Sequence, residues 1–162
     1  MATSSDWQTE ALARTFLSGV RGAIPGAQAQ VDVLLHIVDQ WTPNPRAVLD
    51  LGCGDGILGH AVLERHPGTR VWFLDFSAPM LAAARERLAA DARASFVQAD
   101  LATSDWLRAV DGVRPDLVTT YVDGVVGIRV DTHLFRRQQP VTRLICWFNH
   151  RAPSALIRPR VD

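Results

Sequence analysis

The sequence predicts an α/β fold in which a parallel sheet is flanked by helices. Two observations carry this prediction. Short apolar segments alternate with amphipathic ones between about residues 28 and 121, and the first apolar segment leads directly into a glycine loop at residues 52–56. Strands that alternate with helices are typical of a parallel sheet with right-handed crossovers, covered on both faces. The length of 162 residues suits one domain of ordinary size.

Two helices are expected before the first strand. Apolar residues recur at near-helical spacing over residues 6–21, and a stronger apolar stripe follows over residues 31–41. The stripe consists of Val31, Leu34, Leu35, Val38 and Trp41, which are interpreted as core or docking residues. The sequence Thr-Pro-Asn-Pro ends the second helix. Residues 1–42 are therefore interpreted as an N-terminal helical cap.

After residue 42 the apolar pattern becomes that of short buried strands separated by helices. The expected strands are 47–49, 71–74, 95–97 and 116–121. The expected helices between them are 57–66, 78–90 and 104–110. Residues 43–122 thus form the predicted sheet core, and residues 123–162 remain as a tail of different character.

Composition excludes several classes of protein. Hydrophobic residues make up 48% and charged residues 21% of the chain, which argues against wholesale disorder. No apolar run approaches the ~18 residues of a membrane span, and the N-terminus lacks the pattern of a signal peptide. The two cysteines fit a reducing compartment. We therefore expect a cytoplasmic protein without a membrane partner.

The charge distribution is uneven although the net charge is zero. Residues 1–128 hold 10 Arg and 15 Asp or Glu, a net charge of −5, whereas residues 129–162 hold 7 Arg and 2 Asp, a net charge of +5. A basic tail can indicate nucleic-acid binding. Basic and aromatic residues are not interleaved there as in a known binding module, so the sequence disfavours a nucleic-acid partner.

Acidic residues follow the strand ends next to the glycine loop. Glycines 52, 54 and 56 allow a sharp turn and the close approach of a ligand. Asp75 ends the second predicted strand, 21 residues after Gly54, and Asp100 follows the third. Ligands of open α/β sheets bind at the carboxyl ends of the strands, and a carboxylate at this spacing can accept hydrogen bonds from ribose hydroxyls. This pattern predicts a nucleoside-binding site.

Three motifs in this order and spacing resemble the class I S-adenosylmethionine-dependent methyltransferases. They are VLDLGCGDG (48–56), VWFLDFSAPML (71–81) and FVQADL (96–101). The resemblance covers roughly residues 28–121 and implies a Rossmann-like fold, S-adenosylmethionine as cofactor, and methyl transfer to a small-molecule acceptor. It identifies no catalytic residue.

The resemblance also implies which residues bind the cofactor. The loop residues Asp50, Gly52, Cys53, Gly54 and Gly56 would hold the methionine part. Asp75 would hold the ribose, Phe76 would pack on the adenine, and Asp100, with Leu101 beside it, would bind the adenine amino group. Arg21 is included because RGAIPG (21–26) is similar to a stretch near the cofactor in some small-molecule members.

Two other functions stay open. The first is a catalytically inactive remnant that still binds S-adenosylmethionine or S-adenosylhomocysteine. The second is an NAD(P)-binding domain, because Gly54-x-Gly56-x-x-Gly59 fits the dinucleotide fingerprint. That alternative would place Asp50 inside a buried parallel strand, where an unpaired carboxylate is costly, so we expect the strand to end near Asp50.

The segment after Tyr121 departs from the family pattern. Members usually continue with a helix, a fifth strand, a further helix and an antiparallel hairpin, which need about 60 residues at average element sizes. Only 41 residues follow Tyr121. Without later strands the fourth strand would be an unpaired apolar edge. We interpret residues 123–162 as a truncated or frameshifted tail. The alternative is a genuine short variant whose strand at 144–148 covers the edge, inside a homodimer.

Some reactive residue types have simpler interpretations. Cys53 has no basic neighbour in the sequence to activate it as a nucleophile. His60 and His66 lack a matching ligand pair for a metal site, so no metal is expected and both are placed on a solvated or half-buried helix face. The run Arg85-Glu86-Arg87 is interpreted as solvated surface, and Asp55 as the N-cap of the helix that follows it.

Overall fold

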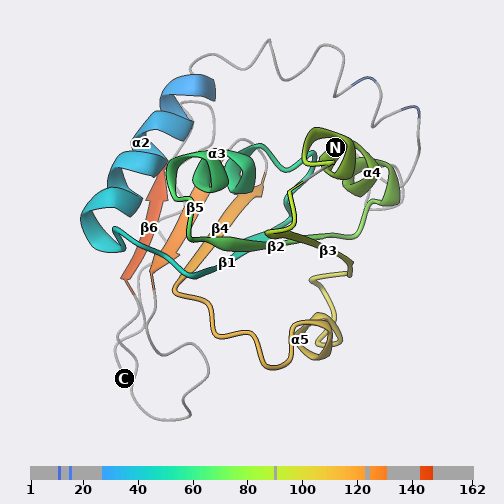
Figure 1. Cartoon of the computed structure of the whole chain (residues 1–162). Coiled ribbons are helices and arrows are strands. Elements are labelled where there is room, and N and C mark those ends of the chain that lie inside the picture. The colour runs from blue at the N-terminus through green and yellow to red at the C-terminus, as the bar shows by residue number, and fades with distance from the viewer. Residues whose placement is uncertain are drawn as a thin grey trace.

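A six-stranded sheet runs through the described part of the chain, in the order β3-β2-β1-β4-β5-β6 (Figure 1). The computed structural model describes residues 11, 15, 27–89, 91–122, 125–130 and 143–147. The strands are β1 (Ala47–Leu51), β2 (Arg70–Asp75), β3 (Ala94–Gln98), β4 (Leu117–Val122), β5 (Val125–Val130) and β6 (Arg143–Trp147). The helices are α2 (Ala27–Trp41), α3 (Ile57–Arg65), α4 (Ala78–Arg87) and α5 (Trp106–Ala109).

The first four strands are parallel, which confirms the predicted Rossmann-like α/β fold. Helices α2, α3 and α4 lie on one face of the sheet and α5 lies on the other (Figure 1). β1 is central, between β2 and β4, so the strand order reverses beside it. In open α/β sheets a ligand crevice forms outside the carboxyl ends of the strands at this reversal. The glycine loop follows β1 at that point.

Alternate strand residues supply two separate cores. Val48, Val71 and Phe73 face α3 and α4, where they join one buried cluster. The neighbouring residues Leu49 and Leu74 face α5 and form a second cluster. This alternation is expected when both faces of a sheet are covered.

Several predicted boundaries differ from the structure. α4 ends at Arg87, three residues before the predicted end, and β1 continues through Asp50 to Leu51. Trp41 is 46% exposed and does not join the core with Leu34 and Val38. Of the predicted helix 6–21, only residues 11 and 15 are described, both helical, and Arg21 lies outside the described residues. None of the described helices is long and apolar enough to cross a membrane.

The fourth strand is not an unpaired edge, and the strand predicted at 144–148 is present as β6 but lies beside β5. β5 pairs antiparallel with β4, from Leu117↔Val130 to Val122↔Val125, and β6 pairs antiparallel with β5. An antiparallel neighbour needs only a two-residue connection, whereas a parallel one needs a long crossover. A short segment after β4 can therefore cover the edge within one chain. α2 lies against β5 on the helix-rich face (Figure 1).

Gly59 has a packing role that leads to a stability prediction. A Cβ atom at Gly59 would lie 2.3 Å from Cε1 of Phe73, a fully buried ring. We expect Gly59→Ala to destabilise the protein by about 1–3 kcal/mol, because the core cannot make room without strain. Urea unfolding followed by circular dichroism measures this loss. Gly68→Ala is the matched control, since a Cβ there would meet nothing within 4 Å. Equal stability of both variants would contradict the packing role.

Candidate functional site

The glycine loop after β1 has the backbone conformation that the sequence predicts. Gly52, Gly54 and Gly56 all have positive φ angles, of 64°, 55° and 78°. Side chains are strained in this region, so glycine is required at these positions. A Cβ on Gly54 would meet no heavy atom within 4 Å, whereas one on Gly56 would lie 3.2 Å from Ala84 Cβ. The loop therefore packs on α4 at Gly56 and presents bare peptide to open space at Gly54.

Asp75, at the end of β2, fastens this loop to the sheet. Its Oδ2 accepts a hydrogen bond from the Gly54 N–H at 2.8 Å, and its Oδ1 accepts one from the Ser77 N–H at 2.8 Å. The Cys53 N–H donates to the Leu74 carbonyl at 3.0 Å. Burial raises the pKa of Asp75, while the N–H donors of Ser77 and Gly54 lower it. The structure thus brings together the two predicted halves of the site, the loop and Asp75.

Arg87 fastens the loop from the opposite side, a contact that the sequence analysis missed. Its guanidinium donates to Asp55 Oδ2 at 2.6 Å and to the Asp55 carbonyl at 3.0 Å. Residues 85–87 are all exposed, as predicted for a solvated surface, but Arg87 also contacts the loop, and Arg85 lies over the Phe96 ring, 5.3 Å from its centroid. Asp55 is not the N-cap of α3; that position belongs to Gly56. The available signal was the position of Arg87 three residues after Ala84, which places the two on neighbouring positions of one helix face.

Asp50 is fully buried in β1, one residue before the strand ends at Leu51. The cost of burial is offset because Oδ1 accepts from the Thr119 hydroxyl at 2.8 Å and Oδ2 from the Gly59 N–H at 3.1 Å. Burial raises the pKa of Asp50 to about 7. Its carboxyl joins β1 to β4 and α3, beneath the loop. A direct contact of Asp50 with the cofactor stays a prediction.

The predicted adenine-side residues lie at the ends of β2 and β3, next to each other in the sheet. The Ala99 N–H donates to the Asp75 carbonyl at 3.0 Å, and the Gln98 side chain donates to the Phe76 carbonyl at 3.2 Å. Asp100 is exposed, and its Oδ1 accepts from the Ala102 N–H at 2.8 Å. Leu101 is exposed as well. The roles of Phe76, Asp100 and Leu101 toward an adenine remain predictions.

Cys53 and the histidines do not form a reactive centre in the described part of the chain. Burial raises the pKa of the Cys53 thiol, which keeps it protonated and weakly nucleophilic. Among the described residues no three His, Cys, Asp or Glu side chains gather as a metal site. His66 is buried after the end of α3, which corrects its predicted place on a solvated or half-buried helix face.

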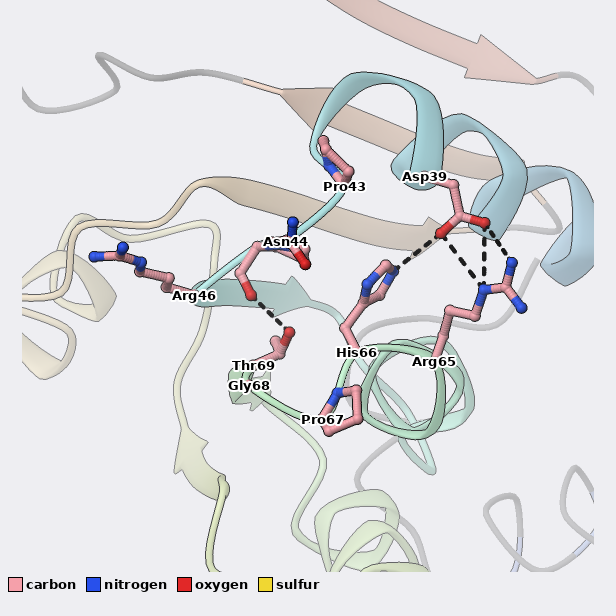
Figure 2. Close-up of a pocket in the computed structure, with 10 residues that line it drawn as sticks. Asp39, Pro43, Asn44, Arg46, Arg65, His66, Pro67, Gly68 and Thr69 are labelled. Atoms are coloured by element: carbon pink, nitrogen blue, oxygen red, sulfur yellow. Dashed lines mark hydrogen bonds and ion pairs between the residues drawn. The ribbon is translucent and has the colours of Figure 1, made fainter.

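A cavity of about 450 Å³ lies at the opposite edge of the sheet, near the amino ends of β1 and β2 (Figure 2). There Asp39 of α2 pairs with Arg65 of α3 at 2.7 Å, and His66 Nε2 lies 3.4 Å from the same carboxylate. The Arg65 hydrogen bond lowers the pKa of Asp39. These contacts join α2 to α3. The cavity lies at the amino ends of these strands, whereas a ligand held by the glycine loop would lie at their carboxyl ends.

Known proteins resemble this chain over the same region. Residues 49–145 match the family described as "Methyltransferase domain", a range that extends beyond residue 123 into the predicted tail. The trans-aconitate 2-methyltransferase of Acidovorax sp. (strain JS42) is 46% identical over 76 residues, which cover 47% of this chain and 26% of that protein. The ribosomal RNA large subunit methyltransferase G of Streptomyces avermitilis is 38% identical over 116 residues, or 69% of this chain and 26% of that protein.

Solved structures support the fold. A structure of an S-adenosylmethionine-bound amino pentose methyltransferase from Micromonospora echinaspora aligns with a TM-score of 0.51 at 19% identity, covering 80% of this chain and 72% of that one. At this identity the likeness concerns the fold alone. The chain spans about a quarter of the length of the curated relatives above.

The buried carboxyl of Asp50 leads to a prediction about pH. Its folded pKa of about 7 exceeds the unfolded value near 4, so the folded state holds a proton that the unfolded chain releases. The resulting stabilisation is full below about pH 4 and is lost as the pH rises through about 7. Between pH 5 and 8 the wild type should lose about 2–3 kcal/mol more stability than Asp50→Asn. Urea unfolding at both pH values measures this difference.

The variant Asp105→Asn, which changes an exposed carboxyl, is the control and should keep the pH dependence of the wild type. Identical pH dependence in the wild type and Asp50→Asn would show that Asp50 does not titrate in this range.

Proposed function

The chain belongs to the methyltransferase domain family of class I, whose cofactor is S-adenosylmethionine, and from this premise we propose that it transfers a methyl group to a small-molecule acceptor. The observation that carries the proposal is the bare peptide at Gly54, positioned directly beside the Asp75 carboxylate at the carboxyl ends of β1 and β2. A nucleoside with an extended substituent fits this arrangement.

The residues fit this cofactor better than a dinucleotide. The Asp75 carboxylate lies beside the loop, and a negative group there favours a sulfonium cation over a pyrophosphate. Gly59, the third glycine of the dinucleotide fingerprint, does not distinguish between the two cofactors. A glycine is needed there because a Cβ would collide with the Phe73 ring. NAD(P) is therefore the weaker alternative.

Positioning is the main contribution of the protein in this proposal. S-adenosylmethionine supplies the activated methyl group. The loop at 52–56 would hold its amino-acid part, Asp75 its ribose hydroxyls, and Phe76 and Asp100 its adenine. Holding the donor in one geometry and excluding water contributes up to ~7–11 kcal/mol in favourable cases. A general base is needed only for an acceptor that arrives protonated.

Two features support a small acceptor. The trans-aconitate enzyme is a small-molecule methyltransferase by name. Residues 1–128, which contain the predicted cofactor site, also carry a net charge of −5, which opposes the approach of a phosphate backbone to that part of the chain, whereas residues 129–162 carry +5. The similarity to a ribosomal RNA methyltransferase makes RNA the competing acceptor. Incubation with methyl-labelled S-adenosylmethionine and either a metabolite extract containing trans-aconitate or ribosomal RNA distinguishes them. Label in RNA alone would contradict the proposal, and label in neither would favour the inactive remnant.

Asp75→Ala should weaken the binding of S-adenosylhomocysteine by ~1.5–3 kcal/mol, because the carboxylate would lose its hydrogen bonds to the ribose. Isothermal titration calorimetry gives the dissociation constants. Asp105→Ala, which changes an exposed carboxylate immediately before α5, should leave them unchanged. An unaltered affinity in Asp75→Ala would remove Asp75 from the site.

A further inference from the structure

We propose that Arg87 is a positioning residue for the amino-acid half of the cofactor site. This inference rests on the function proposed above and deepens it. It assigns to the last residue of α4 the task of holding the glycine loop in the conformation that receives the ligand. Arg87 itself does not touch the predicted ligand position; it acts through Asp55.

The geometry places two contacts from one face of α4 on the loop. Ala84 packs against Gly56, where a Cβ would come within 3.2 Å of the Ala84 Cβ. Arg87, three residues later and therefore on the same helix face, donates to both the carbonyl and the carboxylate of Asp55. Asp55 lies between Gly54 and Gly56. The two contacts thus hold the segment that carries the exposed peptide.

An anchor on this side of the loop matters because Gly52, Gly54 and Gly56 all have positive φ angles. Glycines at positive φ are free to adopt many other conformations, so ordering them costs conformational entropy. On the β2 side the loop is held by Leu74 and Asp75. On the α4 side, the loop is held among the described residues by the ion pair between Arg87 and Asp55.

Partial burial strengthens the ion pair between Arg87 and Asp55. The Asp55 side chain is 2% exposed and that of Arg87 is 36% exposed, so one partner is almost fully removed from water. Solvent screening, which makes fully exposed ion pairs weak, is reduced for such a pair. A charge-assisted hydrogen bond to a buried carboxylate is also among the stronger side-chain contacts.

Arg87 contacts only one half of the site, which gives the inference a specific signature. Asp75, on β2, contacts the loop at Gly54 and also serves the predicted ribose position. Arg87 contacts the loop alone, which is predicted to hold the amino-acid part. Loss of Arg87 should therefore weaken a ligand that carries the amino acid more than one that lacks it. A general loss of stability would affect both ligands alike.

The experiment compares S-adenosylhomocysteine with 5′-methylthioadenosine, which keeps the nucleoside and the thioether but lacks the amino acid. Isothermal titration is carried out on the wild type, Arg87→Ala, Arg87→Lys and Arg85→Ala. Arg85→Ala is the matched control, since it removes the same charge from the same helix but its guanidinium lies over Phe96. Arg87→Lys keeps the charge but cannot make both hydrogen bonds in parallel, and it replaces Arg87→Ala should that variant not fold.

In Arg87→Ala the dissociation constant of S-adenosylhomocysteine should rise about tenfold, and that of 5′-methylthioadenosine less than about twofold. Arg87→Lys should fall between the wild type and Arg87→Ala, and Arg85→Ala should match the wild type. Equal weakening of both ligands, or unchanged binding of both, would overturn the positioning role while the proposed function stands. If the wild type binds neither ligand, the proposed function itself fails, and this inference fails with it.

Discussion

The hydrogen bonds that the Asp75 carboxylate accepts from Gly54 and Ser77 are the interaction on which the rest of the site depends. They join the loop after β1 to the start of α4. Gly54 and Asp75 are 21 residues apart in the sequence. Charge-assisted hydrogen bonds of this kind contribute about 1.5–3 kcal/mol each and offset the burial of the carboxylate. The same side chain retains acceptor capacity, because each carboxylate oxygen has more than one lone pair. It can therefore shape the loop and still bind a ligand.

Three aspartates lie in or around the loop, and each has its own donors. Asp50 of β1 accepts from Thr119 and Gly59. Asp75 ends β2 and accepts from Gly54, and Asp55, in the loop itself, pairs with Arg87 on α4. Their mutual repulsion raises the pKa of Asp50 in addition to the larger effect of burial. Of the three carboxylates, Asp55 is neutralised by Arg87, and Asp75 is the one that the predicted cofactor position adjoins.

The fold and the outline of the site could be predicted because they depend on local patterns. The alternation of strands and helices, the glycines at 52, 54 and 56, and the acid after β2 are visible in sequence and were placed correctly relative to one another. Long-range partners were not visible. Nothing near Asp50 in sequence indicates that Thr119 would share its carboxylate, and nothing near Asp55 points to Arg87, because the sheet and α4 bring these pairs together. The antiparallel β5 was missed since its Val and Gly residues lack both alternation and a helical period.

The most direct test is a crystal structure of the chain with S-adenosylhomocysteine. We expect the amino-acid part over Gly54, the ribose hydroxyls within hydrogen-bond distance of Asp75, and the Arg87–Asp55 contact intact. A ligand bound in the cavity between α2 and α3, at the amino ends of β1 and β2, would contradict this expectation (Figure 2). So would a glycine loop closed over Gly54 by neighbouring side chains.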